Sequence, residues 1–104
     1  SFEVRYGYNL DRTVDEIRPN YSFDVSCAGS VPESIICFLD ASDFEDTIRN
    51  AVSLGGDADT QAAIAGSIAG AYWDIPKNIE YKSVHRLDYF LLNALIEFEE
   101  KFPL

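Results

Sequence analysis

Positive charge is scarce in this chain. Among 104 residues, eight lysine and arginine residues stand against eighteen aspartate and glutamate residues, and the formal net charge is −10 at pH 7. Proteins hold the phosphate backbone of nucleic acids mainly with lysine and arginine, so the charge balance argues against a nucleic-acid partner. The acidity is compatible with cation binding, although acidic surfaces more often serve solubility.

Long apolar runs, methionine and cysteine are also absent or rare. No apolar run approaches the roughly 20 residues that cross a bilayer, and no segment resembles a signal peptide, so we expect a cytoplasmic protein without a membrane partner.

Cys27 and Cys37 are too few for a disulfide scaffold, and we expect both to be reduced and at least one to be buried. With His85 as the one histidine, a Cys–His nucleophile has little support, and the catalytic residues stay unknown. The chain lacks methionine and begins at Ser1, which indicates a processed product or a piece of a longer protein.

The residues that are present suffice for one small domain. Hydrophobic residues make up 47% of the chain, which is too much for a disordered tail, and the length allows one modest core. The first residues, "FEVRYGY", alternate apolar and polar side chains and predict a strand or an extended arm. The next segment, "LDRTVDEIRP", predicts a short helix with Val14 and Ile17 facing inward, ended by Pro19.

Two capping patterns predict consecutive helices in the middle of the chain. In "SVPE", Ser30 as N-cap and Glu33 three residues later form a capping box, and the helix should reach about Ala41. In "SDFE", Ser42 and Glu45 repeat the pattern. The apolar residues expected on the inner sides of these helices are Ile35, Ile36 and Leu39 in the first, and Phe44, Ile48, Ala51 and Val52 in the second.

A segment of unusually small side chains follows, "SLGGDADTQAAIAGSIAGAYW". Its double glycine ends the preceding helix, and a new helix is predicted over about residues 59–73. Gly66 and Gly70 each cost a helix roughly 1 kcal/mol relative to alanine, so we expect close packing against neighbouring helices to compensate. Pro76 ends this helix, and a last helix is predicted over residues 83–102, with apolar side chains at 3-4-3 spacing.

Three residues with side-chain oxygens, Asp57, Asp59 and Thr60, stand at the start of the small-residue helix, in an acidic loop of residues 55–60. Two carboxylates and a hydroxyl are hard ligands that suit Mg²⁺, Mn²⁺ or Ca²⁺ rather than Zn²⁺. The two glycines before them let the backbone curl around an ion. The alternative is that one aspartate simply caps the helix, as acidic residues commonly do. One carboxylate suffices for a cap, so the second one favours a metal site.

Other motif assignments can be tested by counting. An EF-hand loop beginning at Asp57 would need glycine at its sixth position and glutamate at its twelfth, where the chain has Ala62 and Ile68. Gly66 and Gly70 do not follow the pattern of a phosphate loop or a dinucleotide fingerprint. An Asp-x-Asp motif also occurs in metal-dependent glycosyltransferases, but there it usually ends a strand of an α/β fold, whereas here it follows a predicted helix.

The whole string over residues 30–76, from "SVPESIICFLDASDFEDTIRN" to "AVSLGGDADTQAAIAGSIAGAYWDIP", resembles the C-terminal part of the ADP-ribosylglycohydrolase family. That family includes the dinitrogenase-reductase-activating glycohydrolases. Its pattern is a Val-Pro helix, an acidic helix ending in Leu-Gly-Gly-Asp-x-Asp-Thr, and a small-residue helix ending in Gly-Ala-Tyr, and all three occur here in order. The preceding "DEIRPNYSFDVSCAG" looks similar to the same region of bacterial members.

The resemblance implies an all-α fold, a helical bundle corresponding to the C-terminal portion of the family fold, with an extended N-terminal arm. It also implies a binuclear Mg²⁺ site, served by Mn²⁺ in some members, to which Asp57, Asp59 and Thr60 contribute, with Asp59 shared by both ions. The implied reaction is hydrolysis of the N- or O-glycosidic bond that joins ADP-ribose to a protein side chain, commonly arginine. Val25 is similar to an apolar position that borders the substrate ribose in some members.

Two departures from the family pattern bear on function. Asp74 replaces the usual glycine, but it lies far along the helix from the ligands, and we expect its effect to be local. The family's other metal cluster, a Thr-Asp-Asp in the N-terminal half, is absent from this sequence, as are the upstream loops that hold adenosine and diphosphate.

We therefore interpret residues 1–104 as a single partial domain, resembling the last third of such an enzyme. An N-terminal portion or a second chain would complete it, and an ADP-ribosylated protein would be its substrate. The alternative is an inactive, stand-alone helical module for interaction or structure, derived from the family.

Overall fold

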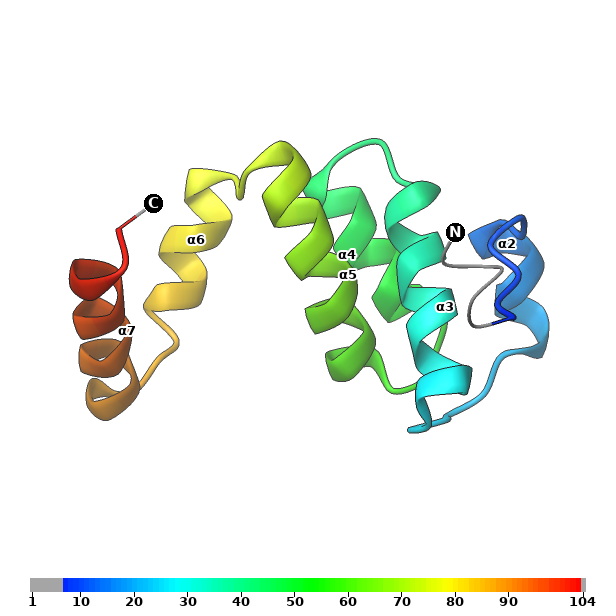
Figure 1. Ribbon diagram of the computed structural model, residues 1–104, viewed down its shortest axis with the longest axis horizontal. Coiled ribbons are helices and arrows are strands. Elements are labelled where there is room, and N and C mark those ends of the chain that lie inside the picture. Colours follow the sequence, from blue (N-terminus) through cyan, green and yellow to red (C-terminus); the bar gives the residue numbers. More distant parts are fainter. Residues whose placement is uncertain (1–6, 104) are drawn as a thin grey trace. The chain divides into compact units, whose positions relative to one another are not determined.

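The computed structural model describes residues 7–103, which form helices joined by turns and loops (Figure 1). The helices, in chain order, are α2 (Val14–Ile17), the 3-10 helix η1 (Arg18–Asn20), α3 (Cys27–Leu39), α4 (Phe44–Ser53), α5 (Ala58–Trp73), α6 (Lys77–Val84) and α7 (Tyr89–Lys101). Residues 7–103 contain no strand, which confirms the predicted all-α class. The segment that predicts a strand or an extended arm lies outside the described residues, except for Gly7 and Tyr8, which are in a turn and in irregular backbone.

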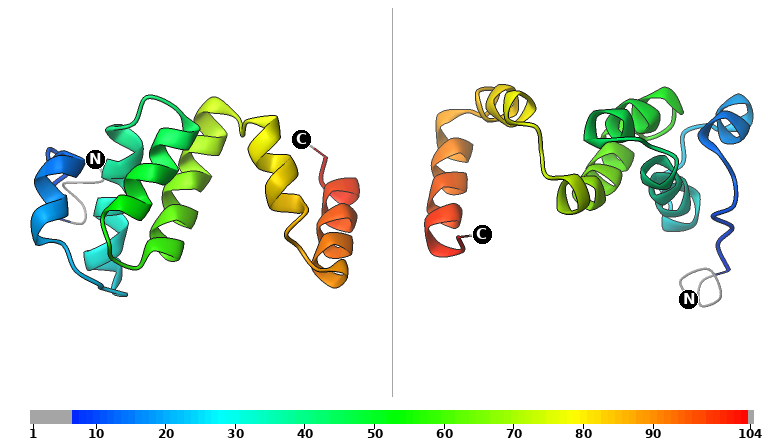
Figure 2. Two further views of the ribbon diagram at one scale, coloured as in Figure 1. Left: turned by 180° about the vertical axis from the view of Figure 1, so that it is seen from behind. Right: turned by 90° about the horizontal axis from the view of Figure 1, so that it is seen from above.

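Contacts between residues divide the chain into two compact units, Ser1–Asp74 and Ile75–Leu104. In the first unit, α3, α4 and α5 lie side by side and α2 packs against α3 (Figures 1 and 2). The interpretation of residues 1–104 as a single partial domain stays a prediction. The buried core of the first unit consists of Val14, Ile17, Ile36, Cys37, Ala51, Leu54 and Ala65.

The small-residue helix α5 packs against both α3 and α4, as its composition predicts. Ala65 and Ala69 are fully buried. A methyl group added at Gly66 would lie 2.9 Å from Cδ1 of Ile48 on α4. The small side chains therefore permit a close approach of the helices, which compensates for the low helix propensity of glycine.

The N-cap predicted at Ser30 is wrong, because α3 begins earlier, at Cys27. Ser26 is the N-cap, and its hydroxyl accepts a hydrogen bond from the Gly29 amide at 3.0 Å. Ser30 lies inside the helix, where its hydroxyl donates to the Ser26 carbonyl at 2.6 Å. Ser26 and Ser30 are both residues that can cap a helix. Capping by Ser26 is favoured because it allows the helix to begin one turn earlier.

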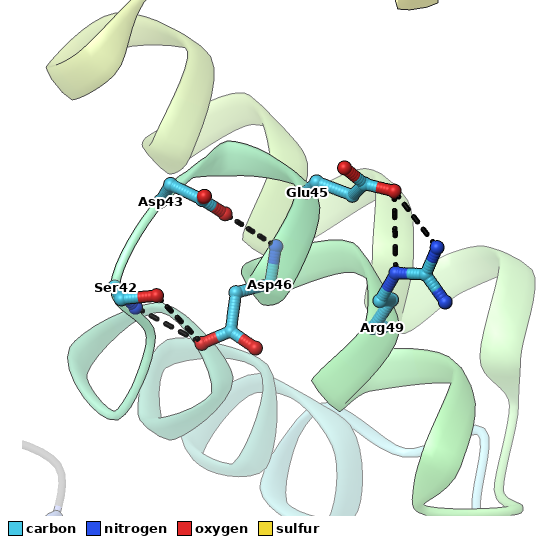
Figure 3. Close-up of a pocket in the computed structure, with 5 residues that line it drawn as sticks. All are labelled: Ser42, Asp43, Glu45, Asp46 and Arg49. Carbon is cyan, nitrogen blue, oxygen red and sulfur yellow. Dashed lines mark hydrogen bonds and ion pairs between the residues drawn. The ribbon is translucent and has the colours of Figure 1, made fainter.

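The N-cap predicted at Ser42 is also wrong, because Asp43 caps α4 instead. Oδ1 of Asp43 accepts a hydrogen bond from the Asp46 amide at 2.8 Å (Figure 3). The Ser42 amide donates to Oδ2 of Asp46 at 3.0 Å, which secures the residue just before the helix. Aspartate and serine cap helices about equally well, so the sequence pattern does not distinguish between neighbouring candidates.

Two of the apolar positions predicted to face inward are exposed. Leu39 is 57% exposed and Val52 is 56% exposed, at the last turns of α3 and α4. The buried face of α4 runs instead through Phe44, Thr47 and Ala51, so Val52 lies beyond its edge. The short helix predicted around Val14 and Ile17 is confirmed, with both side chains buried, as is the burial of one free cysteine, Cys37.

The second unit consists of α6 and α7, and the single last helix predicted over residues 83–102 is wrong. A second helix start intervenes at Asp88, whose carboxylate accepts a hydrogen bond from the Leu91 amide at 2.9 Å. Neither α6 nor α7, in the described residues, contains a buried side chain. No helix of residues 7–103 has the length and apolar character needed to cross a membrane.

The predicted end of α5 is confirmed, because the helix stops at Trp73, shortly before Pro76. Asp74 follows with φ of +64° and ψ of 157°. Glycine adopts this backbone conformation readily, whereas a residue with a side chain adopts it at a cost. Asp74 therefore has a glycine-like backbone conformation, with strain at that one residue.

Candidate metal-binding loop

The three predicted ligands lie together at the start of α5. Asp57 is the N-cap residue of the helix, and Asp59 and Thr60 belong to its first turn. The chain leaves α4 through Gly55, whose φ of +76° is readily available to glycine. The double glycine thus ends α4 as predicted, and the acidic loop that begins with it leads into α5.

The side chain of Asp57 does not act as a helix cap. It accepts no hydrogen bond from the first-turn amides of α5 in the described structure. By contrast, Asp43 and Asp88 each accept such a bond at the starts of α4 and α7. The first amides of a helix carry partial positive charge and attract anionic groups, so an N-cap carboxylate that accepts none of their hydrogen bonds is unusual. The capping alternative therefore lacks its defining hydrogen bond at Asp57.

The carboxyl groups of Asp57 and Asp59 lie within hydrogen-bonding reach of each other. This contact is the main reason why the pKa of Asp59 lies below its usual value. The Thr60 amide lowers the pKa further by donating to Oδ1 of Asp59 at 2.9 Å. Asp59 and Thr60 are exposed and Asp57 is partly exposed, so all three side chains are accessible. Two carboxyl groups side by side at an accessible surface form a natural place for a cation.

The donor set fits a hard divalent cation. Carboxylate and hydroxyl oxygens are the ligands that Mg²⁺ prefers, and Mg²⁺ takes six of them in near-octahedral geometry. The loop offers two carboxylates and one hydroxyl. Within residues 7–103, no group of three or more His, Cys, Asp or Glu side chains gathers in a metal-binding arrangement. Further donors to an ion at this loop would therefore come from water or from other protein groups.

A second acidic cluster, at the start of α4, has a different character (Figure 3). Asp43 accepts a hydrogen bond from the Asp46 amide, and Asp46 accepts one from the Ser42 amide. Glu45 pairs with Arg49 one turn later, at 2.8 Å. These carboxylates complete the helix start and its surface, so we assign the cluster to capping rather than to ligand binding.

Val25, the predicted ribose-contacting residue, lies in the irregular segment before α3 and is 70% exposed. Its substrate contact stays a prediction. The segment around it is connected to the acidic loop, because the Tyr21 hydroxyl accepts a hydrogen bond from Nε2 of Gln61 at 2.6 Å. Sequence reasoning missed this pair. The one signal was Gln61 itself, a long polar side chain near the start of a helix that consists mostly of small and apolar residues.

Comparison with known proteins gives one family. The family model described as ADP-ribosylglycohydrolase matches residues 4–100. An uncharacterized protein of Archaeoglobus fulgidus is 36% identical over 70 residues, which cover 66% of this chain and 23% of that protein. The ADP-ribosylhydrolase ARH3 of Mus musculus is 34% identical over 83 residues, covering 66% of this chain and 22% of the mouse protein.

The match to the human relative covers a similar share of each chain as the match to the mouse relative. The ADP-ribosylhydrolase ARH3 of Homo sapiens is 36% identical over 72 residues, covering 59% of this chain and 20% of the human protein. The matched part of the chain thus spans only 20% to 23% of the length of these curated relatives. No solved structure gives a significant match.

Proposed function

We propose a function for this chain from one premise: it belongs to the ADP-ribosylglycohydrolase family. The chain is proposed to be the C-terminal portion of a Mg²⁺-dependent hydrolase that cleaves the glycosidic bond between ADP-ribose and a protein side chain. The observation that carries this proposal is the adjacent pair of carboxyl groups, Asp57 and Asp59, of which Asp57 is not used as a helix cap. The mouse and human relatives named ADP-ribosylhydrolase support the substrate class.

The three loop residues would each contribute a donor to the metal site. Asp59 is proposed as the carboxylate shared by two ions, because the Thr60 amide holds its Oδ1 and so fixes its orientation. Asp57 would contribute the second carboxylate and Thr60 its hydroxyl oxygen. A helix start is a rigid support, which favours fixed positions for these donors. Bound Mg²⁺ or Mn²⁺ would supply positive charge that orients the ribose hydroxyls and an attacking water.

The other donors would lie outside this chain. The matched part covers about a fifth of the relatives, so we propose that an N-terminal portion, on the same polypeptide or a second one, supplies the remaining ligands and the adenosine and diphosphate contacts. An ADP-ribosylated protein is the proposed substrate, with Val25 beside its ribose. A cytoplasmic location belongs to the same proposal.

Reconstitution tests the proposed function. The 104-residue chain alone should release no ADP-ribose from ADP-ribosylated arginine substrates. Mixed with the N-terminal portion of a close relative, it should recover Mg²⁺-dependent release, because ligands from both parts must surround the ions. Recovered release that does not depend on Asp59 would remove the metal role. A stable complex without any release would favour the alternative, an inactive helical module.

A further inference from the structure

Tyr21 contacts the chain on both sides of the three predicted ligands. After the loop, Nε2 of Gln61 donates a hydrogen bond to the Tyr21 hydroxyl at 2.6 Å. Before the predicted ligands, Gly56 lies so close to the Tyr21 ring that a methyl group added at Gly56 would overlap with Cε2 of the ring. The Tyr21 hydroxyl in turn donates to the carbonyl of Gly29, in the first turn of α3. One side chain therefore holds the two ends of the segment that contains the predicted ligands.

Gln61 is the buried part of this arrangement. It is fully buried, although the two residues before it are exposed. A buried amide is costly unless it is hydrogen-bonded, and Tyr21 satisfies Nε2. Oε1 is buried without a partner in the described part of the chain, and it would lie 3.0 Å from a methyl group at Gly56. The Gln61 backbone amide donates to the Asp57 carbonyl at 2.9 Å, so Gln61 links Tyr21 to Asp57 through one helical turn.

We propose that Tyr21 is a positioning residue for the acidic loop. Its ring packs on Gly56 and its hydroxyl binds Gln61, so that the residues between them adopt one conformation. The use of this conformation for binding a metal ion rests on the proposed function, whereas the fixing of the loop does not. Tyr21 acts through its two neighbours and is not itself a ligand.

The same contact has a second consequence for the site. Residues 21–29 include Val25, and the bond between Tyr21 and Gln61 ties this segment to the start of α5. The predicted ribose-contacting residue and the predicted metal ligands therefore share one support. A change at Tyr21 would disturb both together.

Removal of one hydroxyl tests the proposal. Tyr21→Phe deletes the hydrogen bonds of the hydroxyl to Gln61 and to the Gly29 carbonyl and keeps the ring. Tyr72→Phe makes the same chemical change at an exposed position near the other end of α5, and it is the matched control. Ile36→Val lowers the stability of the same core without removing a hydrogen-bonding group, and it controls for general destabilisation.

The first readout is amide hydrogen exchange along α5, measured by NMR on the 104-residue chain. Protection of the Gln61 amide should fall by about tenfold in Tyr21→Phe, beyond any change at the middle of the helix, because the loop opens locally. Neither control should show this local loss. A loss that is uniform along α5, as general destabilisation by Ile36→Val would give, overturns the proposal.

The second readout is binding of Mn²⁺ alone, followed by the electron paramagnetic resonance signal of the free ion. The affinity should fall by about tenfold in Tyr21→Phe, which is typical for residues that orient metal ligands, and stay unchanged in both controls. If Asp59→Asn weakens Mn²⁺ binding and Tyr21→Phe does not, the positioning role is overturned. If Asp59→Asn has no effect while Gln61 loses protection, the metal role fails and the support of the loop by Tyr21 stands.

Discussion

The starts of α4 and α5 both carry acidic clusters, and they use their carboxylates differently. At α4, Asp43 accepts a backbone hydrogen bond and serves as the cap. At α5, Asp57 occupies the same N-cap position without a capping bond, and its carboxyl group lies beside that of Asp59. Acidic residues at a helix start are therefore not evidence of a metal site by themselves. The informative difference is whether the N-cap carboxylate accepts a hydrogen bond from the helix amides.

The start of α5 is held by tertiary contacts instead of a cap. Gly56 packs on the Tyr21 ring, and Gln61 is buried with its amide bonded to the Tyr21 hydroxyl. Contacts of this kind stabilise the first turn without engaging a carboxylate. The Asp57 carboxyl group is therefore not required for order at the helix start, whereas Oδ1 of Asp59 accepts a hydrogen bond from the Thr60 amide there.

The largest expected effect concerns activity in the reconstituted enzyme. Asp59→Asn should reduce ADP-ribose release on the order of 100-fold or more, since it removes the charge proposed to lie between two ions. Asp57→Asn should reduce release less, and Thr60→Ala least. Asp43→Asn is the matched control, because asparagine caps α4 as well as aspartate does and the same charge is lost. Equal losses from Asp43→Asn and Asp59→Asn would end the contrast between the two helix starts.

The next effect concerns the two glycines that lead into α5. Gly56→Ala should destabilise the chain by about 1–3 kcal/mol, because the added methyl group overlaps with the ring of Tyr21. Gly55→Ala should cost about 1 kcal/mol, because its φ of +76° is unfavourable for alanine although the space around it is open. Urea denaturation measures both. A Gly56→Ala variant as stable as the parent chain would show that Tyr21 does not hold the loop.

A smaller effect distinguishes the two N-cap aspartates directly. Asp43→Ala should lower the free energy of unfolding by about 1 kcal/mol through loss of its capping bond. Asp57→Ala should leave it nearly unchanged, since no capping bond is lost. Urea denaturation at pH 7 and low salt measures the two variants side by side. Equal losses would mean that Asp57 caps α5 in solution.

The smallest effect is a shift in titration. Asp59 should titrate below its usual pKa of 3.8 in the parent chain, and its pKa should rise toward 3.8 in Asp57→Ala. A lowered pKa in the folded chain means that the charged form is favoured by folding. The resulting stability is present above pH 3.8 and is lost as the pH falls through the folded value. NMR titration of the side-chain carboxyl carbons checks both points, and a pKa unaffected by Asp57→Ala would show that the two groups do not interact.

The sequence predicted the elements of the first unit better than their boundaries. The end of α4 at the double glycine and the end of α5 before Pro76 follow from backbone chemistry that few residues share. Helix starts were less certain, because Ser26 and Asp43 cap as well as the predicted Ser30 and Ser42. Local patterns identify capable residues, and packing then selects among them.

The predicted ligands are adjacent in sequence, which is why a sequence pattern could locate Asp57, Asp59 and Thr60. Their support could not be located in the same way. Tyr21 lies 40 residues before Gln61, and no local spacing or periodicity connects the two. Gln61 is a long polar side chain near the start of the helix, but only the fold shows that it is buried and that Tyr21 is its partner.

The span between Tyr21 and Gln61 has a consequence for the order of folding. Bringing two residues 40 positions apart into contact requires closure of a long loop, which costs conformational entropy before any contact forms. The turn between α4 and α5 joins neighbours in sequence and closes quickly. We expect the helices to associate first and the bond to Tyr21 to form afterwards. The acidic loop would then reach its final geometry late in folding. Before that step, the chain would contain the predicted ligands but not the arrangement proposed for binding a metal ion.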